Sequence, residues 1–207
     1  MKGKFIVFEG IDGSGKSTQL KKLTERLLQE GHSVYPTFEP TSGPMGKMIR
    51  EIFKGEVRTN QESIAALFLA DRLHHIKDDE NGMLKKLDEG YHVICDRYYL
   101  SSYAYHGVHT PLEWVIELNS ICTELLRPDL NIFIDVDPKT SMDRLSSSRE
   151  SMEMYETQSN LTNVKLKYQE AFELIGDQEN ILTINGEQDS EIIAQRVWEA
   201  AEKLFNG

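Results

Sequence analysis

The chain carries a glycine-rich segment close to its start, with the sequence FEGIDGSGKST at residues 8–18. Gly10, Gly15, Lys16 and Ser17 match the pattern G-x-x-x-x-G-K-S/T of a loop that binds phosphate groups. Glycine suits such a loop because successive backbone N–H groups must point at the anion, and side chains would block its approach. An apolar run precedes the loop and a leucine-spaced polar run follows it. The segment therefore predicts a strand, a phosphate-binding loop and a helix, in that order.

A nucleoside triphosphate is the ligand that this loop predicts. The following helix begins with unpaired N–H groups and a partial positive charge, both directed at the bound anion. Lys16 adds a full charge for the β- and γ-phosphates, and the hydroxyl of Ser17 suits Mg²⁺. A glycine-rich turn with an exposed lysine is the alternative, disfavoured by the flanking strand and helix patterns. The residues predicted to bind the nucleotide are Gly10, Ile11, Asp12, Gly13, Ser14, Gly15, Lys16, Ser17 and Thr18.

The size and charge of the chain limit its organisation and its partners. Its 207 residues suffice for one domain with a full core, and no linker-like segment divides them, so we expect a single domain over residues 1–207. The 34 acidic residues exceed the 23 basic ones, and a net charge of -11 argues against nucleic acid as the main partner. No apolar run approaches the roughly 20 residues that span a bilayer. A soluble cytoplasmic protein without a membrane partner is expected.

Short apolar runs alternate with helical patterns along the chain. Continuous hydrophobicity in such runs is typical of strands covered on both faces of a parallel sheet. Strand–helix alternation predicts a three-layer α/β fold with right-handed crossovers. The last helix is expected to place Ile192, Ile193, Val197 and Leu204 on its core side. The expected strands are residues 4–9, 34–38, 92–96, 131–136 and 181–184.

Two proline-containing pairs predict helix starts. Thr110-Pro111 and Asp137-Pro138 each combine an N-cap residue with a proline at the first helical position. Residues 146–160 interrupt this pattern, because they are polar, rich in serine and nearly free of aliphatic side chains. We expect this segment to be a mobile surface insert between two helices.

The class of nucleotide-binding protein is narrowed by what surrounds the loop. A regulatory GTPase needs Asn-Lys-x-Asp on a late strand, and residues 181–187 read ILTINGE. A helicase or motor would usually be larger and more basic. A small-molecule kinase must bring a second anion to the γ-phosphate, and Arg50, Arg72 and Arg97 are candidates to hold it. Arg97 follows an expected strand, at the end where open α/β sheets place their ligands.

Four segments together resemble the thymidylate kinase (dTMP kinase) family, a branch of the P-loop nucleoside monophosphate kinases. They are FEGIDGSGKSTQ, LFLADR, DRYYLSSYAYHG and RPDLNIFIDVDP, and the resemblance covers essentially the whole chain. It implies a five-stranded parallel sheet flanked by helices and the transfer of the γ-phosphoryl group of ATP, with Mg²⁺, to dTMP. It also implies a homodimer.

The resemblance implies roles around the nucleoside of the acceptor. Phe68 would stack on the thymine ring, and Arg72 would hydrogen-bond to its edge. Ser102 and His106 would line the base pocket, although His106 stands where relatives often carry Gln, Thr or Ser. Tyr105 would crowd the 2′ position and so reject ribonucleotides.

Further implied roles concern the phosphates. Lys16 and the loop backbone would hold those of ATP, and Asp12 would reach the acceptor's 3′-hydroxyl. Asp96 would help to place the magnesium ion together with Ser17. Arg50 and Arg97 would clamp the acceptor phosphate.

Two departures from the family pattern shift these expectations. Many relatives have Thr-Arg-Glu-Pro after the second strand, whereas residues 37–40 here read TFEP. Phosphate binding then rests more on Arg50 and Arg97, and Glu39 is expected to shape the acceptor pocket. Ser14 occupies a loop position at which some relatives have arginine. The transition-state charge is therefore assigned to Arg149 in the lid-like insert at 146–160, with Arg144 as the second candidate.

Other functions stay open at this point. A kinase of the same fold could accept another pyrimidine nucleotide or deoxynucleotide, or a deoxynucleoside. A nucleotide-dependent switch that binds a protein partner is a third possibility, although the acceptor-side arginines disfavour it.

Overall fold

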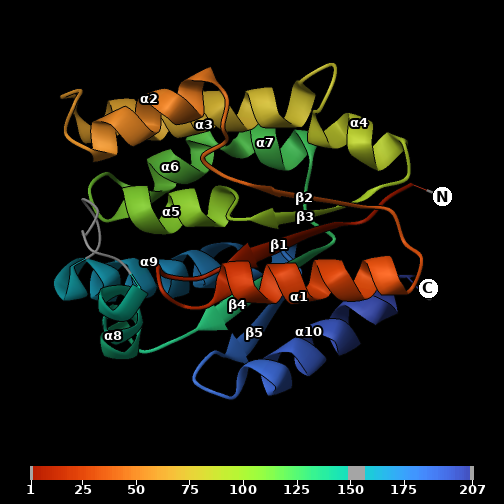
Figure 1. Ribbon diagram of the computed structural model, residues 1–207. Helices are drawn as coiled ribbons and strands as arrows, with labels where there is room; N and C mark the ends of the chain where they lie inside the picture. The colour runs from red at the N-terminus through yellow and green to blue at the C-terminus, as the bar shows by residue number, and fades with distance from the viewer. Residues whose placement is uncertain (1, 149–156, 206–207) are drawn as a thin grey trace.

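A five-stranded, fully parallel sheet forms the centre of the protein (Figure 1). The computed structural model describes residues 2–148 and 157–205. The strand order is β2-β3-β1-β4-β5, which puts the strand before the glycine-rich loop in the middle. The predicted α/β fold is thereby confirmed. The strands are β1 (Phe5–Glu9), β2 (Val34–Phe38), β3 (His92–Asp96), β4 (Leu130–Asp135) and β5 (Ile181–Asn185).

Successive side chains of the central strand β1 point to opposite faces of the sheet and pack into two separate hydrophobic cores. Phe5 and Val7 belong to one buried cluster, whereas Ile6 and Phe8 belong to the cluster on the opposite face of the sheet. All four side chains are at most 1% exposed. Because both faces are covered, the strand reads in sequence as one continuous apolar run.

Helices cover both faces of the sheet (Figure 1). Helices α1 (Lys16–Gln29) and α10 (Ser190–Phe205) pack on one face, and α2 (Pro44–Phe53) packs on α3 in the layer over the other face. None of the helices in the described residues is long and apolar enough to pass through a bilayer. The remaining helical segments are α3 (Gln61–Lys77), α4 (Met83–Asp88), α5 (Tyr99–Gly107), α6 (Leu112–Leu118), α7 (Ser120–Leu125), α8 (Pro138–Ser148), α9 (Gln158–Ile175) and the short 3₁₀ turn η1 (Gly176–Gln178).

The structure corrects some sequence-based expectations at the periphery of the fold. The side chain of Ile192 is 51% exposed, so it does not lie on the core side of α10; Ile193, Val197 and Trp198 do. The edge strands β2 and β5 are only partly covered. A hydrophobic residue on an edge strand, or at the border of the buried face of a helix, can remain exposed, because apolar atoms make up much of any protein surface.

Only one of the two predicted proline helix starts is confirmed. Pro138 is the first residue of α8, and the carboxylate of Asp137 accepts a hydrogen bond from the N–H of Lys139 over 2.8 Å. Helix α6 begins after Pro111. The hydroxyl of Thr110 donates to the carbonyl oxygen of His106, which lies near the C-terminus of the preceding helix, α5. The Thr110 hydroxyl therefore closes one helix and does not cap the next.

The expected insert at 146–160 is helical at both of its ends. Helix α8 continues through Ser148 and α9 begins at Gln158, so residues at both ends of this segment belong to helices. The polar serines at 146 and 147 are compatible with a helix because their hydroxyls donate back to the carbonyls of Met142 and Asp143. Arg149 lies outside the described residues.

Candidate active site at the carboxyl ends of the strands

The glycine-rich loop connects β1 to α1, and two of its glycines lie where a side chain would not fit. Gly10 and Gly13 have φ angles of 140° and 76°. A β-carbon on Gly10 would lie 2.6 Å from the carbonyl oxygen of Ile134, and one on Gly13 would lie 2.7 Å from that of Ser141. The loop is therefore packed closely against β4 and α8, which only residues without side chains allow.

Lys16 lies inside this loop. Its side chain is buried, and Nζ donates hydrogen bonds to the carbonyl oxygens of Gly10 (3.1 Å) and Ile11 (2.9 Å). Burial, and secondarily the charge of Arg97, lower the pKa of Lys16 to about 8 against the opposing charges of Asp96 and Asp12. The ammonium group thus lies within the loop, and it is poorly solvated.

Ser17 and Asp96 bring two hard oxygen groups together at the edge of the loop. The Ser17 hydroxyl donates to Oδ2 of Asp96 over 2.6 Å. Oδ1 of Asp96 is buried and has no hydrogen-bond partner within the described residues. Mg²⁺ prefers oxygen ligands and commonly takes only one or two from the protein, with phosphates supplying others. The two groups therefore fit a magnesium ion.

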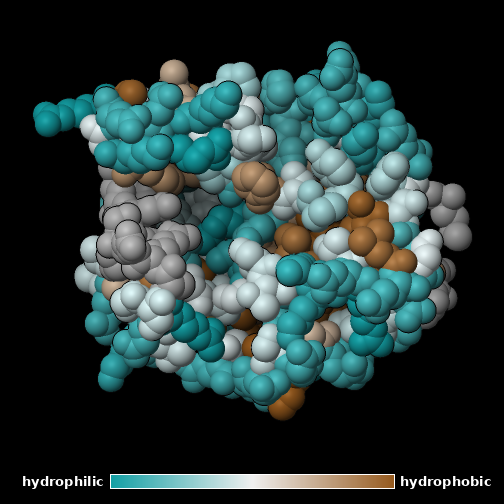
Figure 2. All heavy atoms as spheres, viewed as in Figure 1, coloured by the Kyte–Doolittle hydropathy of each residue, from teal (hydrophilic) through white to brown (hydrophobic). Residues whose placement is uncertain are grey.

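A broad pocket spreads over the loop. Figure 2 shows the molecular surface hollowed between α1 and the helices above the sheet, with hydrophilic atoms in the hollow. Arg144 reaches this pocket from α8, where its Nη2 donates to the carbonyl oxygen of Gly186 over 3.0 Å. The lining residues are Asp12, Gly13, Gly15, Lys16, Ser17, Thr18, Leu20, Pro36, Thr37, Phe38, Glu39, Asp96, Arg97, Arg144 and Leu145.

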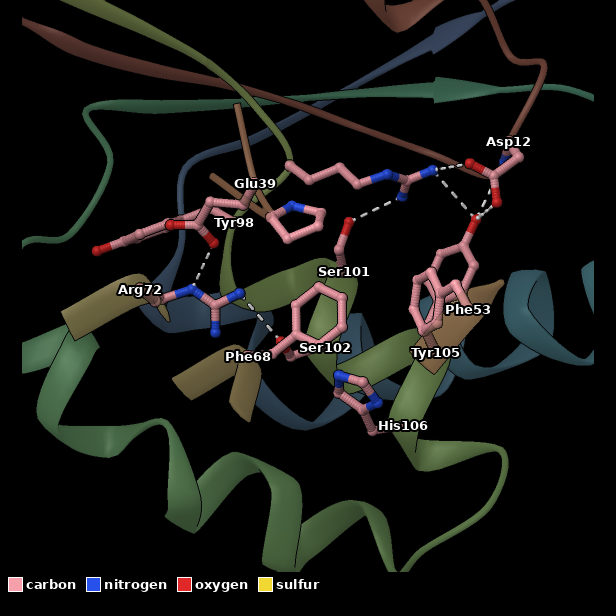
Figure 3. A pocket seen from close by; sticks show the side chains of 12 residues that line it. Asp12, Glu39, Phe53, Phe68, Arg72, Tyr98, Ser101, Ser102, Tyr105 and His106 are labelled. Carbon is pink, nitrogen blue, oxygen red and sulfur yellow. Dashed lines mark hydrogen bonds and ion pairs between the residues drawn. The ribbon is translucent and has the colours of Figure 1, made fainter. Parts of the chain in front are cut away.

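A second pocket adjoins the first and is more apolar (Figure 3). Asp12, Glu39 and Arg97 line both pockets and mark the place where they meet. In Figure 3, Asp12 and Arg72 lie at opposite ends of this pocket, with the ring of Phe68 between them. The other lining residues are Pro40, Phe53, Tyr98, Ser101, Ser102, Tyr105 and His106.

Arg97 is held at this junction by four groups. Nη1 donates to the carbonyl oxygen of Gly10 (3.1 Å) and to Oγ of Ser101 (3.0 Å). Nη2 forms an ion pair with Asp12 and donates to the hydroxyl of Tyr105 over 3.2 Å. Burial opposes ionisation of Asp12, but the charges of Arg97 and Lys16 outweigh it and lower the pKa of this carboxyl. The junction therefore carries a fixed positive charge and an ionised carboxylate.

Arg72 anchors the far end of the second pocket. It is 1% exposed; Nε donates to Glu39 over 2.8 Å, Nη2 to Oγ of Ser102 over 3.0 Å, and Nη1 to Asn119. The other oxygen of Glu39 lies 3.0 Å from Nδ1 of His75. A buried charge needs such pairing to remain charged. The network fixes the guanidinium beside the pocket.

Aromatic rings form the wall between these two ends. The ring of Phe68 lies 4.9 Å from that of His106 and 6.0 Å from that of Phe53, measured between centroids. Burial, followed by the charge of Arg72, lowers the pKa of His106 to about 3, so its imidazole is neutral. In the described part of the chain, its buried Nδ1 has no hydrogen-bond partner.

Arg50 is not brought into either pocket. Its guanidinium donates to the backbone oxygens of Pro40 (3.0 Å) and Thr41 (2.6 Å). Asp71, the residue before Arg72, is 1% exposed and accepts hydrogen bonds from the N–H and hydroxyl of Thr41, both at 2.6 Å. Both residues therefore fix the turn that carries Glu39.

Several residues of the site escaped the sequence reasoning. Glu9, Phe53, His75, Ser101 and Asn119 all contact the residues described above. Only Glu9 gave a signal, because a carboxylate at the end of an otherwise apolar run must find donors when the strand is buried. The others are ordinary residues in helices or, for Asn119, in the turn between α6 and α7, and their role depends on packing that no local pattern reveals.

The comparisons with known proteins agree with this geometry. The family model described as thymidylate kinase matches residues 8–197. The thymidylate kinase of Caldicellulosiruptor saccharolyticus is 43% identical over 148 residues, 70% of each chain. A probable thymidylate kinase of Pyrococcus horikoshii is 44% identical over 151 residues, 70% of this chain and 71% of that protein. The thymidylate kinase of Leptospira borgpetersenii is 33% identical over 203 residues, 98% of this chain and 95% of that protein. The chain belongs to the thymidylate kinase family.

Proposed function

We propose that this protein is a dTMP kinase, which transfers the γ-phosphoryl group of ATP to dTMP and yields ADP and dTDP. Family membership supports the reaction. The observation that carries it is the junction of the two pockets, where Arg97 and Asp12 line both. An acceptor phosphate at this junction would lie next to the γ-phosphate of a nucleotide bound at the glycine-rich loop. Phosphoryl transfer depends mainly on such positioning and on charge neutralisation.

The loop side is proposed to hold ATP. The backbone of residues 10–18 and the ammonium of Lys16 would bind its phosphates, as the closely packed glycines and the buried lysine support. Ser17 and Asp96 would hold Mg²⁺, with the unpartnered Oδ1 of Asp96 supporting this role. When bound, Mg²⁺ neutralises charge on the phosphate oxygens.

The second pocket is proposed to hold dTMP. Phe68 offers a flat aromatic face for the pyrimidine, while Arg72, Ser102 and His106 offer polar atoms near its edge. At the other end, Arg97 would bind the phosphate, and Asp12 and Tyr105 would contact the sugar. Two charges of like sign repel each other, so the arginine is needed to bring two phosphates together.

Four of the expectations remain predictions. The role of Arg50 as a second phosphate clamp would require its guanidinium to leave the carbonyls of Pro40 and Thr41. Arg149 as the source of transition-state charge falls outside the described residues, and Arg144, which reaches the loop pocket, is the second candidate. The homodimer is what the family resemblance implies, and the cytoplasmic location is the expectation from the sequence alone.

A coupled assay of ADP release tests the proposal with dTMP, dUMP, dCMP, AMP and thymidine as acceptors. We expect the highest kcat/KM with dTMP. Activity with dUMP should remain measurable, because one methyl group discriminates by only about 1–3 kcal/mol. A preference for thymidine would instead identify a deoxynucleoside kinase. ADP release that no acceptor stimulates would favour a nucleotide-dependent switch.

A further inference from the structure

Glu9, the last residue of β1, is a buried carboxylate to which neither the loop motif nor the family resemblance gives a role. Its exposure is 0%. It accepts four hydrogen bonds: Oε1 from the N–H groups of Tyr98 (2.9 Å) and Ser101 (3.2 Å), and Oε2 from the hydroxyls of Ser101 (2.5 Å) and Tyr168 (2.8 Å). Four donors satisfy both oxygens of a carboxylate. The hydrogen-bonding capacity of the Glu9 carboxylate is therefore used up by groups around one place in the fold.

That place is the N-terminus of α5. A helix leaves its first N–H groups without partners, and a side chain at the N-cap usually accepts from one of them. The N-cap residue here, Tyr98, makes no such bond with its side chain. Glu9 of β1 takes the place of this missing cap by accepting a hydrogen bond from the N–H of Ser101. Its negative charge also suits the positive end of the helix.

Arg97 directly precedes the N-cap residue of this helix and depends on the same contacts. Its φ is 71°, a left-handed conformation that residues other than glycine rarely adopt without support. Its Nη1 donates to Oγ of Ser101 (3.0 Å), the hydroxyl that in turn donates to Glu9, and to the carbonyl of Gly10 (3.1 Å). Glu9 thus fixes Oγ of Ser101, which accepts a hydrogen bond from the Arg97 guanidinium. It also fixes the start of α5, which holds the backbone of the neighbouring Arg97 in place.

Tyr168 extends the network to α9. Its hydroxyl lies 2.8 Å from Oε2 of Glu9 and 2.8 Å from Oγ of Ser101. Burial raises the pKa of Glu9, opposed by the Ser101 hydrogen bond and the charge of Arg97. The burial of this carboxylate is costly unless such partners compensate it, so the network keeps Glu9 in one position.

We propose that Glu9 is a positioning residue for phosphoryl transfer, which holds Arg97 at the junction of the two pockets through Ser101 and the N-terminus of α5. The inference rests on the proposed function, in which Arg97 binds the acceptor phosphate. Glu9 lines neither pocket and acts through Arg97. A carboxylate that only stabilised the fold would instead affect activity independently of Arg97.

A double-mutant cycle of Glu9→Gln and Arg97→Ala separates these roles. Glutamine keeps the shape of the side chain but offers only one acceptor oxygen and no charge. We expect Glu9→Gln to lower kcat/KM for dTMP by about 10–100-fold, the scale of a misplaced catalytic group. The affinity for a fluorescent ATP analogue should change by less than about twofold. In the Arg97→Ala background the same substitution should have almost no further effect on kcat/KM, because coupled residues are not additive.

Glu179→Gln is the matched control. Glu179 is also buried, with 2% of its side chain exposed, and accepts from the hydroxyl of Tyr99 (2.7 Å) in the same helix without contacting Arg97. The Glu179→Gln substitution should lower the melting temperature of the protein, while kcat/KM for dTMP stays near that of the parent. If Glu9→Gln does not fold, Tyr168→Phe removes one of the four donors and should show the same dependence on Arg97, with a smaller loss.

The outcomes distinguish the two proposals. Multiplicative losses from Glu9→Gln and Arg97→Ala, or near-parental activity of Glu9→Gln, would overturn the inference about Glu9 alone. An Arg97→Ala variant with parental activity would contradict the role of Arg97 in the proposed function, and the inference would fall with it.

Discussion

The hydroxyl of Tyr105 donates a hydrogen bond to Oδ2 of Asp12 over 2.7 Å, and the backbone N–H of Asp12 donates to the same hydroxyl over 3.1 Å. Through this pair, the glycine-rich loop is joined to the wall of the second pocket. The two residues that the family resemblance assigns to the sugar therefore lie side by side, although they are 93 positions apart in the sequence.

Tyr105 is predicted to exclude ribonucleotides by the bulk of its ring. Tyr105→Gly should raise the ratio of kcat/KM for UMP to that for dUMP about tenfold, the scale of steric discrimination in a pocket. Tyr105→Phe loses the bond to Asp12 but keeps the ring, so its ratio should match the parent. Steady-state kinetics with both acceptors provide the measurement. An unchanged ratio in Tyr105→Gly would remove the steric explanation.

Lys16 is predicted to make nucleotide binding sensitive to alkaline pH. Burial and the charge of Arg97 lower its pKa to about 8, and polyphosphate binds to the charged form. Affinity for a fluorescent ATP analogue should fall as pH rises above about 8, by up to about tenfold per pH unit. Lys16→Ala should abolish turnover, keep the far-ultraviolet circular dichroism spectrum, and remove this pH dependence. Constant affinity of the parent up to pH 9.5 would count against the assignment.

His106 is predicted to make the fold less stable in acid. Its pKa in the folded state is about 3, mainly because of burial, against a reference of 6.5. Below pH 6.5 the unfolded chain therefore takes up a proton that the folded protein excludes, and stability falls by up to about 1.4 kcal/mol per pH unit. Urea unfolding of His106→Gln from pH 7 to 5 should show a shallower loss than the parent. The exposed His74, replaced in the same way, serves as the control. Equal slopes in all three proteins would show that folding does not lower the pKa of His106.

Phe68 is predicted to contribute binding energy for the pyrimidine. Stacking adds about 0.5–1.5 kcal/mol to the burial of the ring, so Phe68→Ala should raise KM for dTMP by about tenfold or more. KM for ATP should stay within about twofold, because Phe68 does not line the loop pocket. Phe205→Ala, near the opposite end of the sheet beside His92, should alter neither constant. A rise in both KM values for Phe68→Ala would indicate that its ring only supports the core.

The sequence was informative where a local pattern dictates the structure. The bounds of β2 and β3 were predicted without error, because continuous apolar runs end at turn residues. The glycine-rich loop could be located because its backbone shape itself demands glycine at Gly10 and Gly13. The exposure of Ile192 was not predicted, because neighbouring residues of a helix point in different directions and only Ile193 of this pair faces the core.

The site was harder to predict where its groups meet only after folding. Glu9 and Ser101 lie 92 positions apart, and their contact depends on the pairing of β1 with β3. Arg50 has the residue type and approximate place of a phosphate ligand, but its guanidinium is occupied by the carbonyls of Pro40 and Thr41. Asp71 precedes Arg72 in sequence and is buried for a separate purpose, the anchoring of Thr41.

The transfer itself is tested most directly by ³¹P NMR of a mixture of ATP, Mg²⁺, dTMP and the enzyme. We predict that the β-phosphate resonance of dTDP grows in equal amount to that of ADP, and that neither grows with Lys16→Ala. ADP accompanied by inorganic phosphate, with no dTDP, would contradict the proposal that the junction at Arg97 and Asp12 joins two phosphates.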